Sequence, residues 1–201
     1  MKTKPFSPAP QARRQLKRFY ADLSEGKHNG PLPPPEHLVL RSSSIHSLGC
    51  YTTKALTKGA VVAEYTGPHL TIPVADELYE KSPRTYLFGL ADGKHVIDGA
   101  SIAAFINHCC EPNCEVDEVK GRVWITAIRD IASGEELTYD YNLYDGELDD
   151  FSRCHCGADK CRGSMYSKKE IARRMKKKKG KKATKKAVAK KKKSSAGRKA
   201  H

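Results

Sequence analysis

The chain has 201 residues, of which 38% are apolar, and a formal net charge of +14. This length suits one ordinary domain with appendages, and no run approaches the roughly 20 consecutive apolar residues that a membrane-spanning helix needs. No charged start followed by an apolar block predicts a secretory signal. The seven cysteines are therefore not expected to form disulfides, because the cytosol keeps thiols reduced.

The positive charge is concentrated at the C-terminal end. Residues 167–201 contain 15 lysines and three arginines against one acid, Glu170, whereas the preceding 166 residues carry 19 basic and 22 acidic side chains. The predicted folded part is thus mildly acidic, and a basic tail is attached to it.

The first 35 residues predict an N-terminal extension that ends in a stiff Pro-rich linker, GPLPPP, with a short helical pattern over residues 13–23. Helical patterns in the remainder cover residues 74–81 and 100–105. Glycines separate many strand-like runs, and a hairpin is expected at Gly121. These features predict a mainly β domain with a few short helices over residues 36–150. The strand-like runs are residues 37–41, 49–53, 61–67, 85–90, 95–98, 114–119, 122–128 and 136–141.

The composition changes at Phe151. Residues 151–166 include FSRCHCGADKCRG, which is too small and polar to form a core of its own. After them, Ser167 and Glu170 have the spacing of a capping box, which predicts a short helix. Beyond Gly180 the Lys/Ala/Ser repeats cannot bury apolar surface, so residues 167–201 are expected to be a largely disordered basic tail.

Three cysteines crowd into the stretch INHCCEPNC, residues 106–114. They could be a nucleophile, part of a disulfide framework or metal ligands. The run CHCGADKC places Cys154, Cys156 and Cys161 within eight residues, which suits zinc but leaves its tetrahedron one ligand short. We expect a four-thiolate site that ties this run to the INHCC segment, with His155 outside it. Two alternatives stay open: thiols that are merely neighbours, and a cysteine nucleophile without an identifiable base.

Several segments, in order, resemble the SET-domain protein lysine methyltransferases. They are SSIHSLGCYTTKALTKGAVVAEYTG, TYLFGL, FINHCCEPNC, AIRDIASGEELTYDYN and CHCGADKCRG, and the likeness covers roughly residues 36–165. It implies small β-sheets around a pseudoknot over residues 36–150, followed by a post-SET zinc-binding segment over residues 151–166.

By this resemblance the fourth zinc ligand is Cys110, which would join Cys154, Cys156 and Cys161 around a structural Zn2+. Cys109 stands where serine is usual, and Cys114 is expected to pack without binding metal. S-adenosylmethionine is expected against six residues, namely Ser47, Leu48, Gly49, Tyr86, Asn107 and His108.

The reaction implied is transfer of a methyl group from a sulfonium to a lysine amine. Only the neutral amine attacks, and a free lysine has a pKa of about 10.4. A narrow aromatic channel lowers that pKa by desolvation and aims the amine. Tyr141 matches the family's catalytic tyrosine, Tyr65 another channel tyrosine, and Tyr139 a position held by Phe or Tyr. The hydroxyl of Tyr139 predicts mainly monomethyl product.

Three residues depart from the family pattern: Ser47 replaces a usual Gly, Pro68 an acid, and Ala104 an Arg. The acidic run YDGELDDF, residues 144–151, is expected beside the substrate mouth, where it would attract a basic peptide unless it is only a solvated loop. The tail resembles that of a linker histone or a bacterial histone-like protein. It could bind nucleic acid, act as a nuclear address, or be methylated by the enzyme itself.

The sequence as a whole predicts a protein lysine methyltransferase that acts on a basic, histone or histone-like protein and is held near nucleic acid by its tail. The alternative is a non-catalytic zinc-containing module that binds nucleic acid or chromatin. Either protein is expected inside the cell, in a bacterial cytoplasm or nucleoid or in a eukaryotic nucleus, with no membrane partner.

Overall fold

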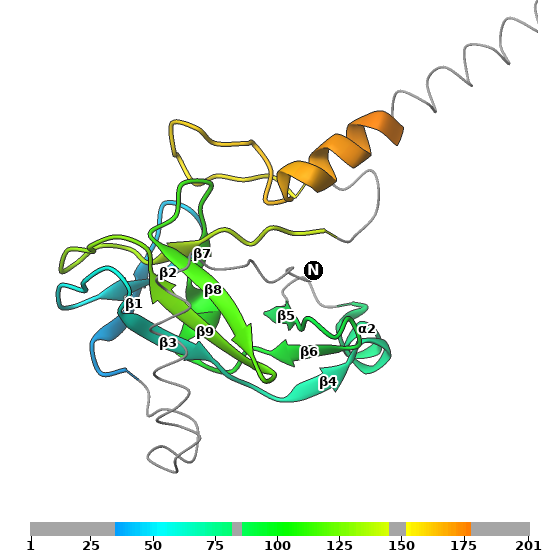
Figure 1. The fold of residues 1–201 in the computed structure, drawn as a ribbon, viewed down its shortest axis with the longest axis horizontal. Helices are drawn as coiled ribbons and strands as arrows, with labels where there is room; N and C mark the ends of the chain where they lie inside the picture. The colour runs from blue at the N-terminus through cyan, green and yellow to red at the C-terminus, as the bar shows by residue number, and fades with distance from the viewer. Residues whose placement is uncertain (1–34, 82–85, 145–151, 178–201) are drawn as a thin grey trace, which may run out of the picture.

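The computed structural model describes residues 35–81, 86–144 and 152–177 (Figure 1). Four expectations fall outside these ranges: the N-terminal extension with its helix at 13–23, the first residue of the strand predicted at 85–90, the acids of the run at 145–150, and the tail beyond residue 177. No helix in the described part of the chain is long and apolar enough to cross a membrane.

The predicted fold class is confirmed, since short strands dominate the described residues. The largest sheet has five strands in the order β3-β9-β8-β10-β7. Its antiparallel part is β3 (Val61–Tyr65), β9 (Arg122–Ala127) and β8 (Cys114–Val119), and β10 (Thr138–Tyr139) runs parallel to β8 and to β7 (Asn107–His108). This arrangement places His108 directly beside Tyr139.

The hairpin between β8 and β9 is confirmed, with Val119 paired to Arg122. The two residues between them, Lys120 and Gly121, have φ angles of +53° and +75°. Two consecutive left-handed residues make the tight turn whose twist matches that of the strands, and Gly121 adopts this conformation without a steric penalty.

Two smaller sheets flank the large one. The first pairs β1 (Leu38–Ser42) with β2 (Leu48–Thr52). The second has the order β4-β6-β5, from β4 (His69–Thr71), β6 (His95–Asp98) and β5 (Leu87–Gly89), and it packs against α2 (Ile72–Tyr79). Figure 1 shows this second sheet and α2 set to one side of the five-stranded sheet.

Between the sheets lies one main core. Its buried side chains include Val62, Phe88, Ile97, Ile125 and Leu137, and the 3-10 turn η1 (Ile102–Phe105) packs against it. The helix predicted at 100–105 is thus a single tight turn. It ends at Ile106, whose extended backbone (φ −74°, ψ 113°) turns the chain into β7.

The segment after β10 forms backbone hydrogen bonds with the C-terminal part of the described chain. Leu143 forms a parallel bridge with Tyr166: its N–H donates to the Met165 carbonyl at 3.1 Å, and its carbonyl accepts from the Ser167 N–H at 2.9 Å. Residues 168–177 then form a helix, which we call the basic helix.

The predicted capping box is half right. The Ser167 hydroxyl accepts from the Glu170 N–H at 3.2 Å, as in an N-cap. The return bond from the Glu170 side chain is absent among the described contacts. The Ser167 N–H is already taken by Leu143, and the Glu170 carboxylate instead binds Arg173 and Arg174.

Candidate functional site

The three predicted catalytic tyrosines come together. Tyr65 ends β3, Tyr139 ends β10, and Tyr141 follows two residues later; the rings of Tyr139 and Tyr141 lie 4.8 Å apart, centroid to centroid. The Tyr141 hydroxyl donates to the Ile106 carbonyl at 2.9 Å, and the Tyr65 hydroxyl donates to the Tyr86 carbonyl at 2.5 Å. Burial raises the pKa of all three phenols, so each stays a neutral hydroxyl.

Tyr141 stands between two cavities. The first, about 180 Å³ in volume, is walled by Phe88, Tyr139 and Tyr141, and Glu115 and Asp140 also line it. The second, about 280 Å³, is also lined by Tyr141. A small aromatic cavity and a larger one that share a tyrosine can hold two reactants on opposite sides of one hydroxyl.

Five of the six predicted cofactor residues line the second cavity, and Gly49 does not. The five are Ser47, Leu48, Tyr86, Asn107 and His108. Gly49 instead packs against Glu136, whose Oε1 would lie 2.2 Å from an added Cβ atom. Several further lining residues were not predicted to belong to the cofactor site, namely Ile45, His46, Ala104, Phe105, Arg153, Cys154, His155 and Met165.

Glu136 does not line this cavity but binds side chains that position its lining residues. Its carboxylate accepts hydrogen bonds from the Asn107 side chain at 2.8 Å, the Ser43 hydroxyl at 2.8 Å and the Tyr51 hydroxyl at 3.0 Å. The Asn107 amide also donates to the Leu48 carbonyl at 3.0 Å. The β1–β2 hairpin, β7 and the segment before β10 therefore meet at one carboxylate, which fixes the loop before β2 against β7.

His108 connects the second cavity to the cysteines. Its Nδ1 accepts the Tyr141 N–H at 3.1 Å, which leaves the ring proton on Nε2, 3.4 Å from the Cys110 sulfur. Burial lowers the pKa of His108 to about 4, so the ring is neutral near pH 7. A neutral imidazole in this tautomer holds the Tyr141 backbone and can donate to a thiolate.

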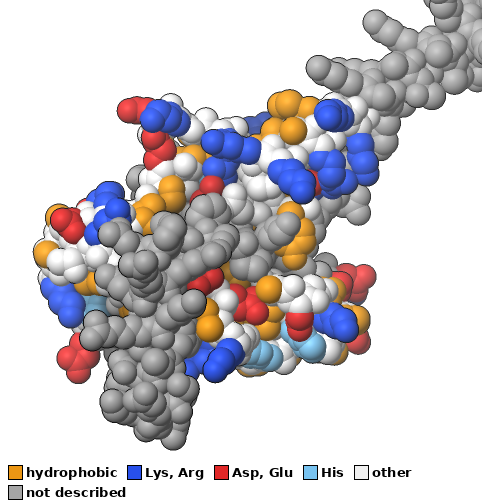
Figure 2. All heavy atoms as spheres, viewed as in Figure 1, with side chains coloured by type: hydrophobic (Ala, Val, Ile, Leu, Met, Phe, Trp, Pro, Cys, Tyr) orange, Lys and Arg blue, Asp and Glu red, His pale blue; other side chains and the backbone are white. Residues whose placement is uncertain are grey.

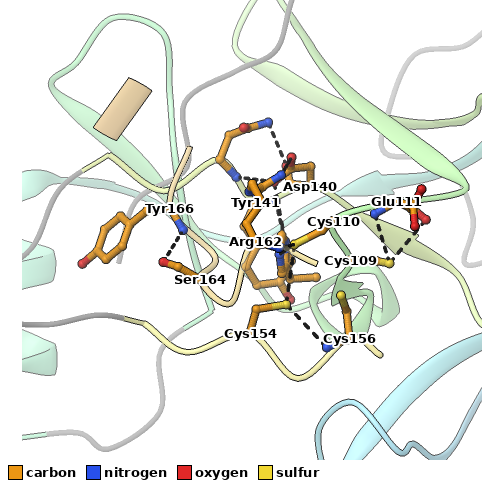
Figure 3. Close-up of polar contacts among 12 residues, drawn as sticks. Cys109, Cys110, Glu111, Asp140, Tyr141, Cys154, Cys156, Arg162, Ser164 and Tyr166 are labelled. Carbon is orange, nitrogen blue, oxygen red and sulfur yellow. Dashed lines mark hydrogen bonds and ion pairs between the residues drawn. The ribbon is translucent and has the colours of Figure 1, made fainter. Parts of the chain in front are cut away.

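The four cysteines predicted to bind zinc converge. The sulfurs of Cys110, Cys154, Cys156 and Cys161 all lie within 4.8 Å of one another, with Cys110 3.8 Å from Cys154 and 4.0 Å from Cys161. Figure 3 shows three of these residues, Cys110, Cys154 and Cys156, close together. A tetrahedron with zinc–sulfur bonds of about 2.3 Å places its sulfurs about 3.8 Å apart, so the spacing fits this ion.

Backbone donors also suit thiolates at this cluster. Three N–H groups point at its sulfurs: Arg162 at Cys110 (3.3 Å), Cys156 at Cys154 (3.4 Å) and Gly163 at Cys161 (3.4 Å). The other predicted packing thiols lie as expected, since Cys114 is fully buried in the core and the Cys109 sulfur bonds to the backbone of Glu111.

An ion pair joins this cluster to the tyrosines. Asp140, between Tyr139 and Tyr141, binds Arg162, the residue after Cys161, and the pair lies close to the cysteines in Figure 3. The Asp140 carboxylate raises the pKa of the Arg162 guanidinium. Sequence reasoning missed this contact because nothing in either segment identifies the other as its partner.

Comparison with known proteins shows what part of the chain is similar to a known family. Residues 47–142 match the family model of the SET domain. The chain is 42% identical over 143 residues to "Histone-lysine N-methyltransferase, H3 lysine-4 specific" of Saccharomyces cerevisiae, a match that covers 64% of this chain and 13% of that protein. It is 39% identical over 141 residues to "Histone-lysine N-methyltransferase ATX2" of Arabidopsis thaliana, covering 64% and 13%.

A human protein, "Histone-lysine N-methyltransferase 2D", is also 39% identical over 141 residues, which cover 64% of this chain and 2% of that protein. The chain thus spans only a small part of the length of these relatives.

Proposed function

We propose that the protein, whose residues 47–142 match the family model of the SET domain, is a protein-lysine N-methyltransferase that uses S-adenosylmethionine. The observation that carries the proposal is Tyr141, which separates an aromatic cavity from a larger one whose lining was predicted to hold the cofactor. The relatives named for histone-lysine methylation support histones or histone-like proteins as the substrate class.

The residues of the second cavity fit this cofactor. Leu48, Phe105 and Met165 offer apolar surface for a purine, Tyr86 and Tyr141 offer rings that attract a sulfonium, and Arg153 suits a carboxylate. S-adenosylmethionine supplies, when bound, a methyl group on a cationic sulfur. Tyr86 is held on one side by Phe105, whose ring centroid lies 5.3 Å away.

The residues of the first cavity would attract the substrate lysine, desolvate its amine and favour its neutral form. The Glu115 carboxylate attracts a lysine ammonium, and the rings of Phe88, Tyr139 and Tyr141 then desolvate it, which lowers its pKa and favours loss of a proton to water. The Tyr141 hydroxyl donates to Ile106 and keeps lone pairs that can accept a bond from the amine. The lone pair on nitrogen is thereby aimed toward the second cavity without a strong base.

We assign Tyr141 and Tyr65 to the walls of this channel. Tyr139 would limit the size of the amine that the channel accepts, which favours a monomethyl product. The Tyr139 side chain is 5% exposed, so its hydroxyl occupies space that a methylated amine would need. We likewise assign Cys110, Cys154, Cys156 and Cys161 to a structural zinc ion, which would hold residues 151–166 as one side of the cofactor cavity.

We further propose that residues 36–150 act as the catalytic domain and that the Lys-rich tail binds nucleic acid through phosphate contacts, which keeps the enzyme at chromatin or a nucleoid inside the cell. The tail's alternative roles as a nuclear address or a methylation substrate make a different prediction, since neither needs binding that weakens with salt.

The direct test is transfer of labelled methyl from S-adenosylmethionine to a mixture of basic proteins. We expect labelling by the natural chain and a loss of about 100-fold or more in the Tyr141→Phe variant, because positioning of the amine depends on that hydroxyl. Labelling that is unchanged in this variant contradicts the mechanism. No labelling of any protein would favour the non-catalytic nucleic-acid-binding module.

A further inference from the structure

A third cavity lies between the basic helix and the turn that follows β5. It has a volume of about 720 Å³ and two unlike walls. One wall is apolar or backbone, from Leu90, Ala91, Gly93 and Tyr144. The other wall is the basic helix with the residue before it, and its lining residues are Ser167, Lys169, Glu170, Ala172, Arg173 and Lys176.

The basic helix is fixed in place, so its wall of the groove is part of the fold. The bridge between Leu143 and Tyr166 ties the start of the helix to the segment after β10. About two turns further along, the Arg174 guanidinium lies over the Tyr166 ring at 3.7 Å from its centroid and bonds to Glu170 at 2.8 Å. Both side chains of that last pair are less than a tenth exposed.

This groove continues from the aromatic cavity of the candidate active site. Phe88 lines the aromatic cavity and Leu90 lines the groove; Asn142 lines the cavity and Tyr144 lines the groove. Residues two apart on an extended segment point the same way and lie about 7 Å apart. The segment from Phe88 to Leu90, which continues β5, thus leads from the aromatic cavity to the groove, whereas Asn142 turns the second segment with a φ of +47°.

Most of the charged side chains on the described helix wall are cationic. Lys169, Arg173 and Lys176 recur at intervals of four and three residues, so they share one helix face about 10 Å long. Figure 2 shows lysine and arginine side chains gathered over this helix. The Glu170 carboxylate is occupied by Arg173 and Arg174, and among the described residues none forms an ion pair with Lys169 or Lys176.

We propose that this groove receives an acidic stretch of the substrate protein, about two to five residues away from the lysine that enters the aromatic cavity. The inference rests on the proposed methyltransferase function and names the substrate class within it. An extended peptide suits a groove with one apolar and one cationic wall, whereas a nucleic acid duplex would need projecting cations without the opposite wall.

A consequence concerns the chain's own Lys-rich tail, which carries the same sign of charge as this wall and is a poor occupant of the groove. The acidic run at residues 145–150 lies outside the described residues.

The test uses peptides with one central lysine, in which a pair of glutamates, alanines or lysines stands three and four residues to either side. Binding is measured by fluorescence anisotropy and transfer by kcat/KM, on the full chain. We expect the glutamate peptide to bind about tenfold more tightly than the alanine peptide and to have a higher kcat/KM. The lysine peptide should bind more weakly than the alanine peptide and have a lower kcat/KM.

Two charge-reversal variants are matched for this test. Lys169→Glu with Lys176→Glu alters the groove, whereas Lys168→Glu with Lys177→Glu makes the same change at exposed positions of the same helix that do not line it. The first variant should reverse the preference between glutamate and lysine peptides, and the second should retain it.

The outcomes separate the two hypotheses. Acidic preference in binding, lost only in the groove variant, supports the groove even if no peptide is methylated, and that lack of transfer would count against the proposed function instead. Methyl transfer that is indifferent to the glutamates overturns the groove proposal. So does a groove variant that weakens binding of a duplex DNA but leaves the peptide preference unchanged.

Discussion

The Asp140 carboxylate and the Arg162 guanidinium form a bidentate ion pair, with N···O distances of 2.6 and 2.7 Å. Both side chains are largely shielded, at 21% and 12% exposed. The backbone N–H of Arg162 also donates to the Cys110 sulfur, and Asp140 lies between Tyr139 and Tyr141. One residue therefore connects the cysteine cluster to the segment that carries the tyrosines.

We predict that Arg162→Leu will weaken cofactor binding about tenfold and speed release of zinc, because it leaves a shielded carboxylate without its partner at a cost of about 2 kcal/mol. Arg162→Lys should be intermediate, since lysine cannot make a bidentate contact. Calorimetry with S-adenosylmethionine and a chromogenic chelator measure the two effects.

The control is Arg129→Leu, which removes an ion pair with Glu135 at the exposed surface. Exposed pairs contribute at most about 1 kcal/mol, so this variant should behave like the natural chain in both assays. If Arg162→Leu also left cofactor binding and zinc release unchanged, the ion pair between Asp140 and Arg162 would not contribute to either property.

Much of the fold could be predicted from local patterns, because alternation of apolar residues and turn glycines act over a few residues. Two strands were missed, β4 (His69–Thr71) and β7 (Asn107–His108). Each is too short to show alternation and exists through pairing with a distant strand. The strand expected at 136–141 is shortened to Thr138–Tyr139 by the same dependence on its partners.

The helix predicted at 74–81 instead spans Ile72–Tyr79, with Pro73 in its first turn. Proline is tolerated there because the first N–H groups of a helix have no partner within it. In the site, residue types with a distinctive spacing could be identified, whereas Glu136, Asp140 and Arg162 could not. Their roles arise from side chains that meet across 29 and 22 residues of sequence, which no local pattern encodes.

The assigned zinc site predicts different effects of substitution at the adjacent residues Cys109 and Cys110. Cys110→Ser should lower zinc content well below one ion per chain and weaken cofactor binding, because Arg153, His155 and Met165 line the cofactor cavity from the segment that the metal would hold. Cys109→Ser should retain zinc, since the Cys109 sulfur bonds to the backbone of Glu111. Elemental analysis measures the content, and equal loss in both variants would refute the assigned ligand set.

The loop before β2 contains a strained residue. Ser47 has a φ of +32°, in the left-handed region that costs a side-chain-bearing residue about 1 kcal/mol or more. We predict that Ser47→Gly will raise the free energy of unfolding by about 1 kcal/mol, measured by chemical denaturation. Ser44→Gly, at an exposed position of the same loop without a positive φ, should give no gain. A loss of stability in Ser47→Gly would show that the serine side chain compensates for the strain.

The size limit in the aromatic cavity predicts a change of product. Removal of the Tyr139 hydroxyl leaves room for a methylated amine to turn, so Tyr139→Phe should shift the product from monomethyl toward dimethyl and trimethyl lysine. Mass spectrometry of the methylated substrate measures this distribution. Tyr79→Phe, whose hydroxyl bonds to Asp98 outside the cavity, should keep the natural distribution. Trimethyl lysine as the main product of the natural chain would contradict the assignment.

The pH dependence of the reaction should report the substrate amine and not the tyrosines. Burial raises the pKa of Tyr139 and Tyr141 above the ordinary value of about 10, so both stay protonated throughout the measurable range. The neutral fraction of a free lysine rises about tenfold per pH unit below its pKa of about 10.4. We therefore expect kcat/KM to rise with a slope near one from about pH 7 and to level off near the pKa of the substrate.

For a peptide whose lysine analogue has a less basic amine, kcat/KM should level off at a lower pH with the same enzyme. The pH at which the profile levels off is set by the pKa of the substrate amine. If kcat/KM instead fell with increasing pH at a pH below about 9.5, and this fall disappeared in Tyr141→Phe, the tyrosine would lose its proton within the measured range. Such a result would contradict the raised pKa of Tyr141 and would show that the transfer needs the protonated hydroxyl in addition to a desolvated amine.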